Sequence, residues 1–166
     1  MPADYTVIFQ VRQWFGDHFF RGDNTTISAI ATEFDTAPYV GRSGDYPFRC
    51  PKVDRSEEAV LHFAVYGADT DHTIQINGRD IPGGIKACPW WDGIKVNGRP
   101  LPMWSSQTLI VPAGYLRKNN TLTIATAPPR NQFQRYVDDF IVDNVSLHYK
   151  LRPAKDLRGT VAGSGR

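Results

Sequence analysis

The sequence predicts an all-β protein, an antiparallel β-sandwich or jelly roll with long aromatic-rich loops. Polar and apolar residues alternate with a period of two in most ordered-looking segments, and no stretch of about twelve residues shows the hydrophobic stripe of a helix. The prolines lie between these segments or at their ends, where no ladder hydrogen bond is lost. Turn signals divide the chain into about seven to nine short strands, as in a sandwich.

The strand predictions rest on this alternation, taken in chain order. The main strands are predicted at residues 5–13, 25–34, 59–66, 72–76, 107–111, 121–126 and 140–151, with shorter ones at 19–20 and 94–96. Asn77-Gly78 and Asn97-Gly98 recur in the phrases INGRDIP and VNGRPLP, and each pair predicts a tight type I′ reversal because both residues tolerate a positive φ. Hydrophobic residues change face after Asp143, which predicts a β-bulge in the last strand.

Three connections in this pattern are long, at residues 35–58, 81–106 and 127–139. Loops longer than about twelve residues are usually functional or disordered, and the Tyr, Trp, Phe and Arg content of these three argues against disorder. Residues 1–152 are therefore predicted to form a single β-sandwich domain. The remaining residues, 153–166 (PAKDLRGTVAGSGR), are small, polar and glycine-rich, and predict a flexible tail.

Composition restricts the classes of partner. The net charge of +2 arises from 19 basic and 17 acidic residues without a block of like charge, so neither nucleic acid nor an anionic membrane is predicted as a partner. No apolar run approaches the roughly eighteen residues of a membrane helix, which predicts a soluble protein. The N-terminal segment does not follow the pattern of a signal peptide, so a cytoplasmic location is expected if Met1 is the native start, and a secreted one if the sequence has been trimmed.

The two cysteines leave two alternatives open. Cys50 and Cys88 each precede a proline, and their spacing fits no zinc motif. They could pair in an oxidising compartment if their Cα atoms came within about 7 Å, and would otherwise remain free thiols.

From residue 59 onward, three motifs occur in a characteristic order. They are IQING at residues 74–78, VPAGYLRKNNTLTI at residues 111–124, and DFIVDNVSL at residues 139–147. This order resembles the galactose-binding-like β-sandwich, the scaffold of many carbohydrate-binding modules and of accessory domains in polysaccharide lyases and glycosidases. The resemblance implies a jelly-roll fold and a lectin-like role. It also implies a structural calcium ion bound by loop oxygens, for which Asp17, Asp23, Asp35 and Asp139 are candidates by composition alone.

The long connections contain the residue types that recognise sugars. An aromatic face packs on the C–H side of a sugar ring, while planar polar side chains bind its hydroxyls. The sequence therefore predicts a non-catalytic module that binds a carbohydrate or other small polar ligand. The predicted ligand-binding residues are Trp90, Trp91, Asp92, Arg99 and Trp104 in one connection and Arg130, Asn131, Gln132, Arg135 and Tyr136 in another.

Two alternatives remain open. In the first, the protein is a small stand-alone enzyme of secondary metabolism or polysaccharide processing, with acid–base chemistry supplied by Asp138, Asp139, His72 and Tyr136. Adjacent strand residues point to opposite faces, so Asp138 and Asp139 could share one site only if the strand bulged. In the second, the same aromatic residues form the interface of a protein-interaction or assembly module.

Overall fold

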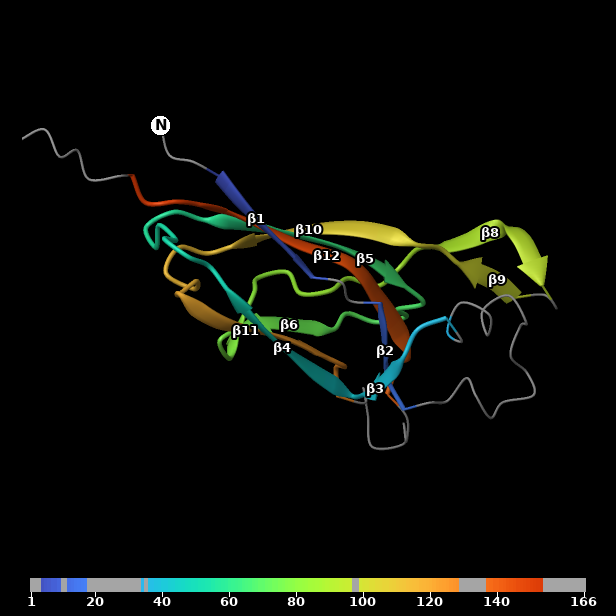
Figure 1. The fold of residues 1–166 in the computed structure, drawn as a ribbon. Helices are drawn as coiled ribbons and strands as arrows, with labels where there is room; N and C mark the ends of the chain where they lie inside the picture. The colour runs from blue at the N-terminus through green and yellow to red at the C-terminus, as the bar shows by residue number, and fades with distance from the viewer. Residues whose placement is uncertain are drawn as a thin grey trace, which may run out of the picture.

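Two large β-sheets pack face to face, and the predicted all-β sandwich is confirmed (Figure 1). The structure is a computed structural model that describes residues 4–9, 12–17, 34, 36–96, 99–128 and 137–153. Among these residues no helix has the length and apolar character that crossing a membrane would require.

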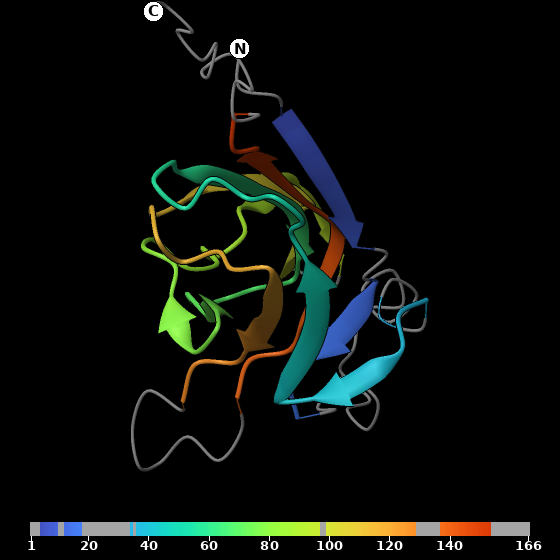
Figure 2. The ribbon, with the colours of Figure 1, turned by 60° about the vertical axis from the view of Figure 1, so that its left-hand side comes forward.

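The larger sheet has six strands, in the order β10-β5-β12-β2-β3, with β1 also paired to β12. Figure 2 shows β1 lying along β12, whose other side pairs with β5. The pair formed by β2 and β3 is parallel and the others are antiparallel. The strands are β1 (Asp4–Phe9), β2 (Gln13–Phe15), β3 (Tyr39–Gly41), β5 (Ala59–Tyr66), β10 (Ser105–Val111) and β12 (Phe140–Lys150).

The smaller sheet has four antiparallel strands in the order β4-β11-β6-β7. They are β4 (Ser43–Arg49), β6 (Thr73–Ile76), β7 (Arg79–Asp80) and β11 (Asn119–Ala125). A separate two-stranded sheet, β8 (Trp90–Val96) with β9 (Arg99–Pro102), extends past the end of β10 in Figure 1.

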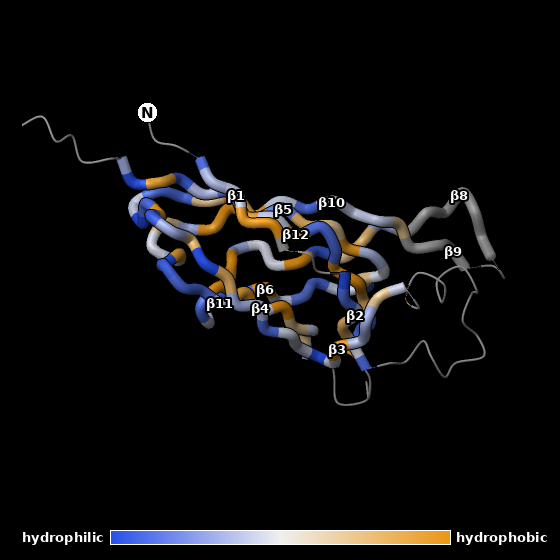
Figure 3. The backbone as a smooth tube through the Cα atoms, viewed as in Figure 1, coloured by the Kyte–Doolittle hydropathy of each residue, from blue (hydrophilic) through white to orange (hydrophobic). Residues whose placement is uncertain are grey.

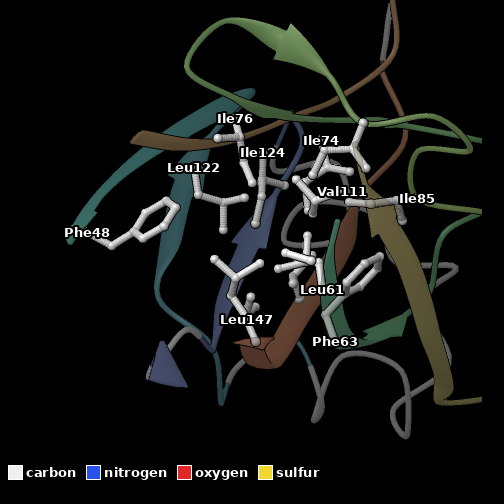
Figure 4. Close-up of a cluster of buried hydrophobic side chains, with 14 of the residues drawn as sticks. Phe48, Leu61, Phe63, Ile74, Ile76, Ile85, Val111, Leu122, Ile124 and Leu147 are labelled. Atoms are coloured by element: carbon white, nitrogen blue, oxygen red, sulfur yellow. The ribbon is translucent and has the colours of Figure 1, made fainter. Parts of the chain in front are cut away.

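The main hydrophobic core lies between the two large sheets. In Figure 4, Ile76, Leu122 and Ile124 of the smaller sheet point toward Leu61 and Leu147 of the larger one, and all five are fully buried. Hydrophobic stretches alternate with hydrophilic ones along the strands of both layers (Figure 3). Burying one of these large apolar side chains stabilises the fold by about 1.5–3 kcal/mol. The period-two pattern, which places such residues on the inner face of each strand, therefore supplies most of the stabilising free energy.

A second hydrophobic cluster covers part of the outer face of the larger sheet. Ile141 pairs in register with Tyr66 on one side and Trp14 on the other, and Phe34 and Ala37 complete the cluster. Because Ile141 alternates with core residues of β12, it faces away from the main core. The larger sheet is therefore hydrophobic on both faces at this end.

The first Asn-Gly reversal is confirmed. Asn77 and Gly78 have φ angles of 55° and 75°, and they connect the paired residues Ile76 and Arg79. A type I′ turn requires positive φ at both central positions. In the second copy Val96 pairs with Arg99, while residues 97 and 98 lie outside the described residues.

The bulge in the last strand is also confirmed. The register between β12 and β5 shifts between Asp143 and Ser146, and Asn144 has a φ of 52°. The predicted strand at residues 5–13 is instead two strands, β1 and β2, that pair with successive parts of β12. The predicted strand at residues 19–20, and all of the one at 25–34 except Phe34, lie outside the described residues, and Phe34 is not part of a strand.

Two of the three long connections contain strands that the sequence pattern did not predict. The connection at residues 35–58 contains β3 and β4, and the one at 81–106 contains the hairpin β8–β9, of which only residues 94–96 were predicted as strand. Gly44 and Pro47 obscure the strand pattern of β4. Proline is tolerated there because β4 pairs only with β11 and so lies at a sheet edge.

The cysteines do not pair with each other. Both are buried, free thiols. Burial raises the pKa of Cys50 to about 12, and it raises the pKa of Cys88 as well. Neither thiol is therefore ionised near neutral pH, so both act as small core residues.

Candidate functional site

The predicted ligand-binding residues fall into three groups in the structure. The backbone of Trp90, Trp91 and Asp92 lies in β8 and that of Arg99 in β9, so the tryptophan segment is a hairpin rather than an open loop. Arg130, Asn131, Gln132, Arg135 and Tyr136 lie outside the described residues. Trp104, between β9 and β10, has a described side chain that is 37% exposed.

The surroundings of Trp104 combine aromatic and charged groups. Its ring lies 5.2 Å from that of Tyr66, centroid to centroid, and the Arg12 guanidinium lies over it at 5.3 Å. Arg12 also donates to Asp143 Oδ2 at 2.7 Å, and Met103 beside Trp104 is 42% exposed. These five residues, Arg12, Tyr66, Met103, Trp104 and Asp143, are called the Trp104 patch.

The Trp104 patch packs against the second hydrophobic cluster. Tyr66 packs edge-on against Phe34, and Phe34 packs against Trp14, so the patch rests on the hydrophobic cluster of the outer sheet face. Arg12 is fixed on its other side by two hydrogen bonds to Thr36 Oγ1, at 2.7 and 3.1 Å. A guanidinium held in this way loses little further side-chain freedom when a ligand binds.

The Trp104 patch offers the contacts that a polar ring compound requires. The partly exposed indole supplies an apolar surface, while Arg12 donates and Asp143 accepts hydrogen bonds. Because the Asp143 carboxylate already neutralises the Arg12 charge, a ligand meets a polar surface with little net charge.

Sequence reasoning missed Arg12, Tyr66 and Asp143, because it assigned all three to strands. No local sequence signal marks Arg12, because its contact depends on the register in which the neighbouring Gln13 pairs with Val142. That register brings Arg12 beside Asp143, and opposite charges on neighbouring strands form a favourable pair.

His72 and Asp138, two of the predicted acid–base residues, lie in direct contact. His72 Nε2 is 2.9 Å from Asp138 Oδ2, and the backbone N–H of Ala127 donates to His72 Nδ1 at 3.1 Å. An N–H that donates to Nδ1 leaves the neutral ring's proton on Nε2, pointing at the carboxylate. Asp138 also accepts the backbone N–H groups of Asp69 and Thr70.

This His72–Asp138 pair joins three segments of chain. The His72 side chain is fully buried and its ring stacks on Phe140 at 4.0 Å. Both ring nitrogens have protein partners, so the imidazole does not face a site where a substrate could bind. The geometry gives the pair a structural role between the start of β6 and the segment before β12.

Asp139 contacts a different part of the protein from Asp138, as the alternation of adjacent residues predicts. Its Oδ1 accepts the Trp14 indole N–H at 3.0 Å, and the residue is buried. A Cβ at Gly16 would lie 1.7 Å from this oxygen, so no other residue fits at that position. Asp138 and Asp139 therefore do not share one site. Tyr136, the fourth acid–base candidate, lies outside the described residues.

Asp17, a calcium candidate, forms an ion pair instead. Its carboxylate binds the Arg42 guanidinium at 2.6 and 2.9 Å and accepts the Val137 N–H, and the hydrogen bond from Arg42 is the main cause of its lowered pKa. Asp23 and Asp35 lie outside the described residues. Across the described ranges, no three His, Cys, Asp or Glu side chains gather as metal ligands.

No protein-family model matches this chain, and neither does any curated protein sequence. Among solved structures, the chain is similar to BuGH86wt in complex with neoagarooctaose, with a TM-score of 0.38 and 17% identity over 67% of this chain and 17% of that one. It therefore spans about 17% of the length of BuGH86wt.

Two further similarities cover most of both chains. One is to the K1 cleaved adhesin domain of Lys-gingipain from Porphyromonas gingivalis W83, with a TM-score of 0.34 and 13% identity over 87% of this chain and 97% of that one. The other is to the Tobacco streak virus coat protein, with a TM-score of 0.30 and 12% identity over 95% of each chain. TM-scores this low assign neither a family nor a ligand.

Proposed function

We propose that this protein is a non-catalytic β-sandwich module that binds a carbohydrate or another small polar ligand at the Trp104 patch. The observation that carries the proposal is a partly exposed tryptophan backed by Tyr66 and flanked by the Arg12–Asp143 pair. An apolar ring surface beside fixed donors and acceptors matches the two-sided chemistry of a sugar.

The hairpin β8–β9 extends this site in the proposal. Trp104 follows β9 after one intervening residue, so the hairpin starts at the Trp104 patch. The additional contacts to the ligand in this proposal are Trp90, Trp91, Asp92 and Arg99 on the hairpin, and Arg130, Asn131, Gln132, Arg135 and Tyr136. They provide the aromatic and planar polar groups that a longer glycan would need.

A binding function accounts for the described polar groups better than catalysis does. The acid–base alternative requires His72 to exchange a buried partner for a substrate, whereas both of its nitrogens are bonded within the fold. The interaction-module alternative requires an oligomer, and sedimentation of the purified protein separates it from a monomeric binding module.

A glycan array followed by titration calorimetry tests the proposal. Trp104→Ala should abolish binding of the identified glycan, whereas Trp104→Phe should retain part of it because a flat ring remains. Tyr5→Ala is the matched control, since Tyr5 is 44% exposed at the opposite end of the larger sheet and should not affect binding.

The same measurement resolves the extent of the site. Trp90→Ala and Trp91→Ala should each weaken binding if the hairpin contributes, and unchanged binding in both would confine the site to the Trp104 patch. An array without any bound glycan would refute a carbohydrate ligand, and full binding by Trp104→Ala would refute the proposed site.

A further inference from the structure

The outer face of the larger sheet carries two histidines on neighbouring strands. His62 lies between two buried residues of β5, and His148 lies between two buried residues of β12. Because strand residues alternate between faces, both imidazoles point outward, away from the main core. The proposed glycan site uses neither of them.

Each histidine is directly opposite a threonine on the strand next to it. His62 pairs with Thr108 of β10, and His148 pairs with Thr6 of β1. In both pairs Nδ1 is hydrogen-bonded to the threonine hydroxyl, at 3.1 Å for His62 and 2.9 Å for His148. The strands β10, β5, β12 and β1 lie side by side in the upper layer of Figure 1, and the two His–Thr pairs occupy adjacent rows across this face.

These hydrogen bonds orient both rings for metal binding. A hydroxyl can accept the Nδ1 proton, and the lone pair is then on Nε2. Histidines that bind metals usually have this arrangement, with one ring nitrogen held by a protein group and the other bound to the ion.

Ser146 lies next to both histidines. Ser146 pairs directly with His62 across β5 and β12, and its hydroxyl lies 3.4 Å from Nε2 of His148. The His148 ring therefore leans along β12 toward the row of His62. His62 and His148 are diagonal neighbours, because His148 itself pairs with Val60. Diagonal neighbours lie about 7–8 Å apart, a span that two long side chains can bridge through a shared ion.

We propose that His62 and His148, with the Ser146 hydroxyl between them, bind a divalent transition-metal ion such as Zn²⁺, Ni²⁺ or Cu²⁺. Two imidazole nitrogens suit these ions, while Ca²⁺ and Mg²⁺ require a set of oxygen ligands. Water or a ligand from solution fills the remaining positions. The next outward residue of β12, Lys150, has its charge neutralised by Asp4 at 2.5 Å.

Electron paramagnetic resonance of Cu²⁺ bound to the untagged protein tests the site directly. The spectrum should show two coordinated imidazole nitrogens, and calorimetry with Ni²⁺ should give one site per chain. His62→Gln and His148→Gln should each reduce the affinity for Ni²⁺ by about tenfold or more. Unfolding curves of the variants establish that they fold, which is expected because both residues are on the surface.

Matched variants distinguish the histidine ligands from the threonines that orient them. Thr6→Val and Thr108→Val should weaken Ni²⁺ binding by about tenfold while keeping two nitrogens in the Cu²⁺ spectrum, since they remove only the group that orients each ring. Ile110→Ala, on the same face, should have no effect. Wild-type affinity in the double variant His62→Gln/His148→Gln, or a spectrum with a single imidazole, would overturn the proposal.

The metal-site proposal and the glycan-site proposal can be tested independently of each other. Trp104→Ala should leave the Ni²⁺ affinity unchanged, and the double histidine variant should leave glycan binding unchanged.

Discussion

Asn77 acts on the fold through its side chain as well as through its backbone. Its amide donates to the Tyr115 carbonyl at 3.0 Å and to Asn120 Oδ1 at 2.9 Å, and its carbonyl accepts the Thr121 N–H at 3.1 Å. Asn120 is buried and in turn bonds both backbone groups of Arg117. One residue of the first Asn-Gly pair therefore anchors the entire segment between β10 and β11.

Replacing Asn77 by alanine should lower the free energy of unfolding by about 2–4 kcal/mol. The substitution removes three hydrogen bonds, worth about 1 kcal/mol each, and leaves a β-carbon at a positive φ. Asn144→Ala is the control, because Asn144 also has a positive φ but is exposed in the bulge. Urea unfolding should show a clearly smaller loss for Asn144→Ala, and equal losses would mean that the Asn77 side chain contributes nothing.

The two Asn-Gly hairpins differ in what they are attached to. The hairpin β6–β7 belongs to the four-stranded sheet, whereas β8–β9 forms a sheet of its own. A substitution at Gly78 should therefore destabilise the core sheet, and the equivalent substitution at Gly98 should mainly affect the hairpin that extends the proposed site.

Gly78→Val should cost about 1–3 kcal/mol, because it places a β-branched residue at a φ of 75° where no neighbour lies within 4 Å of the added Cβ. Gly98→Val should leave the thermal melt nearly unchanged and weaken glycan binding. Thermal melts and binding isotherms of both variants check this, and an equal loss of stability would show that both turns support the sandwich.

The ion pair of Asp17 and Arg42 connects the end of β2 to the turn between β3 and β4. The hydrogen bond from Arg42 lowers the pKa of Asp17 from its ordinary value of 3.8. A carboxylate with a lowered folded-state pKa stabilises the protein fully above its unfolded pKa, and this contribution is lost as the pH falls toward the folded value.

Wild-type protein should therefore lose stability relative to Arg42→Gln as the pH is lowered from about 4. The difference at neutral pH should be small, because Arg42 is more than half exposed and solvent screens the pair. Urea unfolding at several pH values gives the two curves, and parallel curves below pH 4 would exclude a role for this pair.

At the scale of the whole molecule, stability depends on the contact between the two large sheets. Leu122→Ala should lower the free energy of unfolding by about 2–5 kcal/mol, because Leu122 is fully buried and its neighbours cannot close the cavity. Ile110→Ala removes similar atoms from a residue that is 49% exposed and should change stability by about 0.5 kcal/mol or less. A small loss for Leu122→Ala in denaturant unfolding would contradict this assignment of the core.

The sequence by itself determined which segments form most of the core strands and where two irregularities lie. The strand at residues 59–66 matches β5 at both ends, because each inward residue is apolar along its length. The positive φ angles at Asn77 and Gly78 and the bulge after Asp143 were also predictable, since both depend on local residue types. Local signals of this kind act over a few residues and can be read in one dimension.

Tertiary structure decided which of these segments meet. Edge strand β4 was missed because its glycine and proline are tolerated only where a single partner strand is present, and that depends on sheet order. Arg12 joins Trp104 and Asp143, which are 92 and 131 residues away in the chain, through the pairing of β2 with β12. His62 and His148 likewise become neighbours only because β5 pairs with β12 in one particular register. Strand register, which long-range packing determines, therefore assembles both candidate sites.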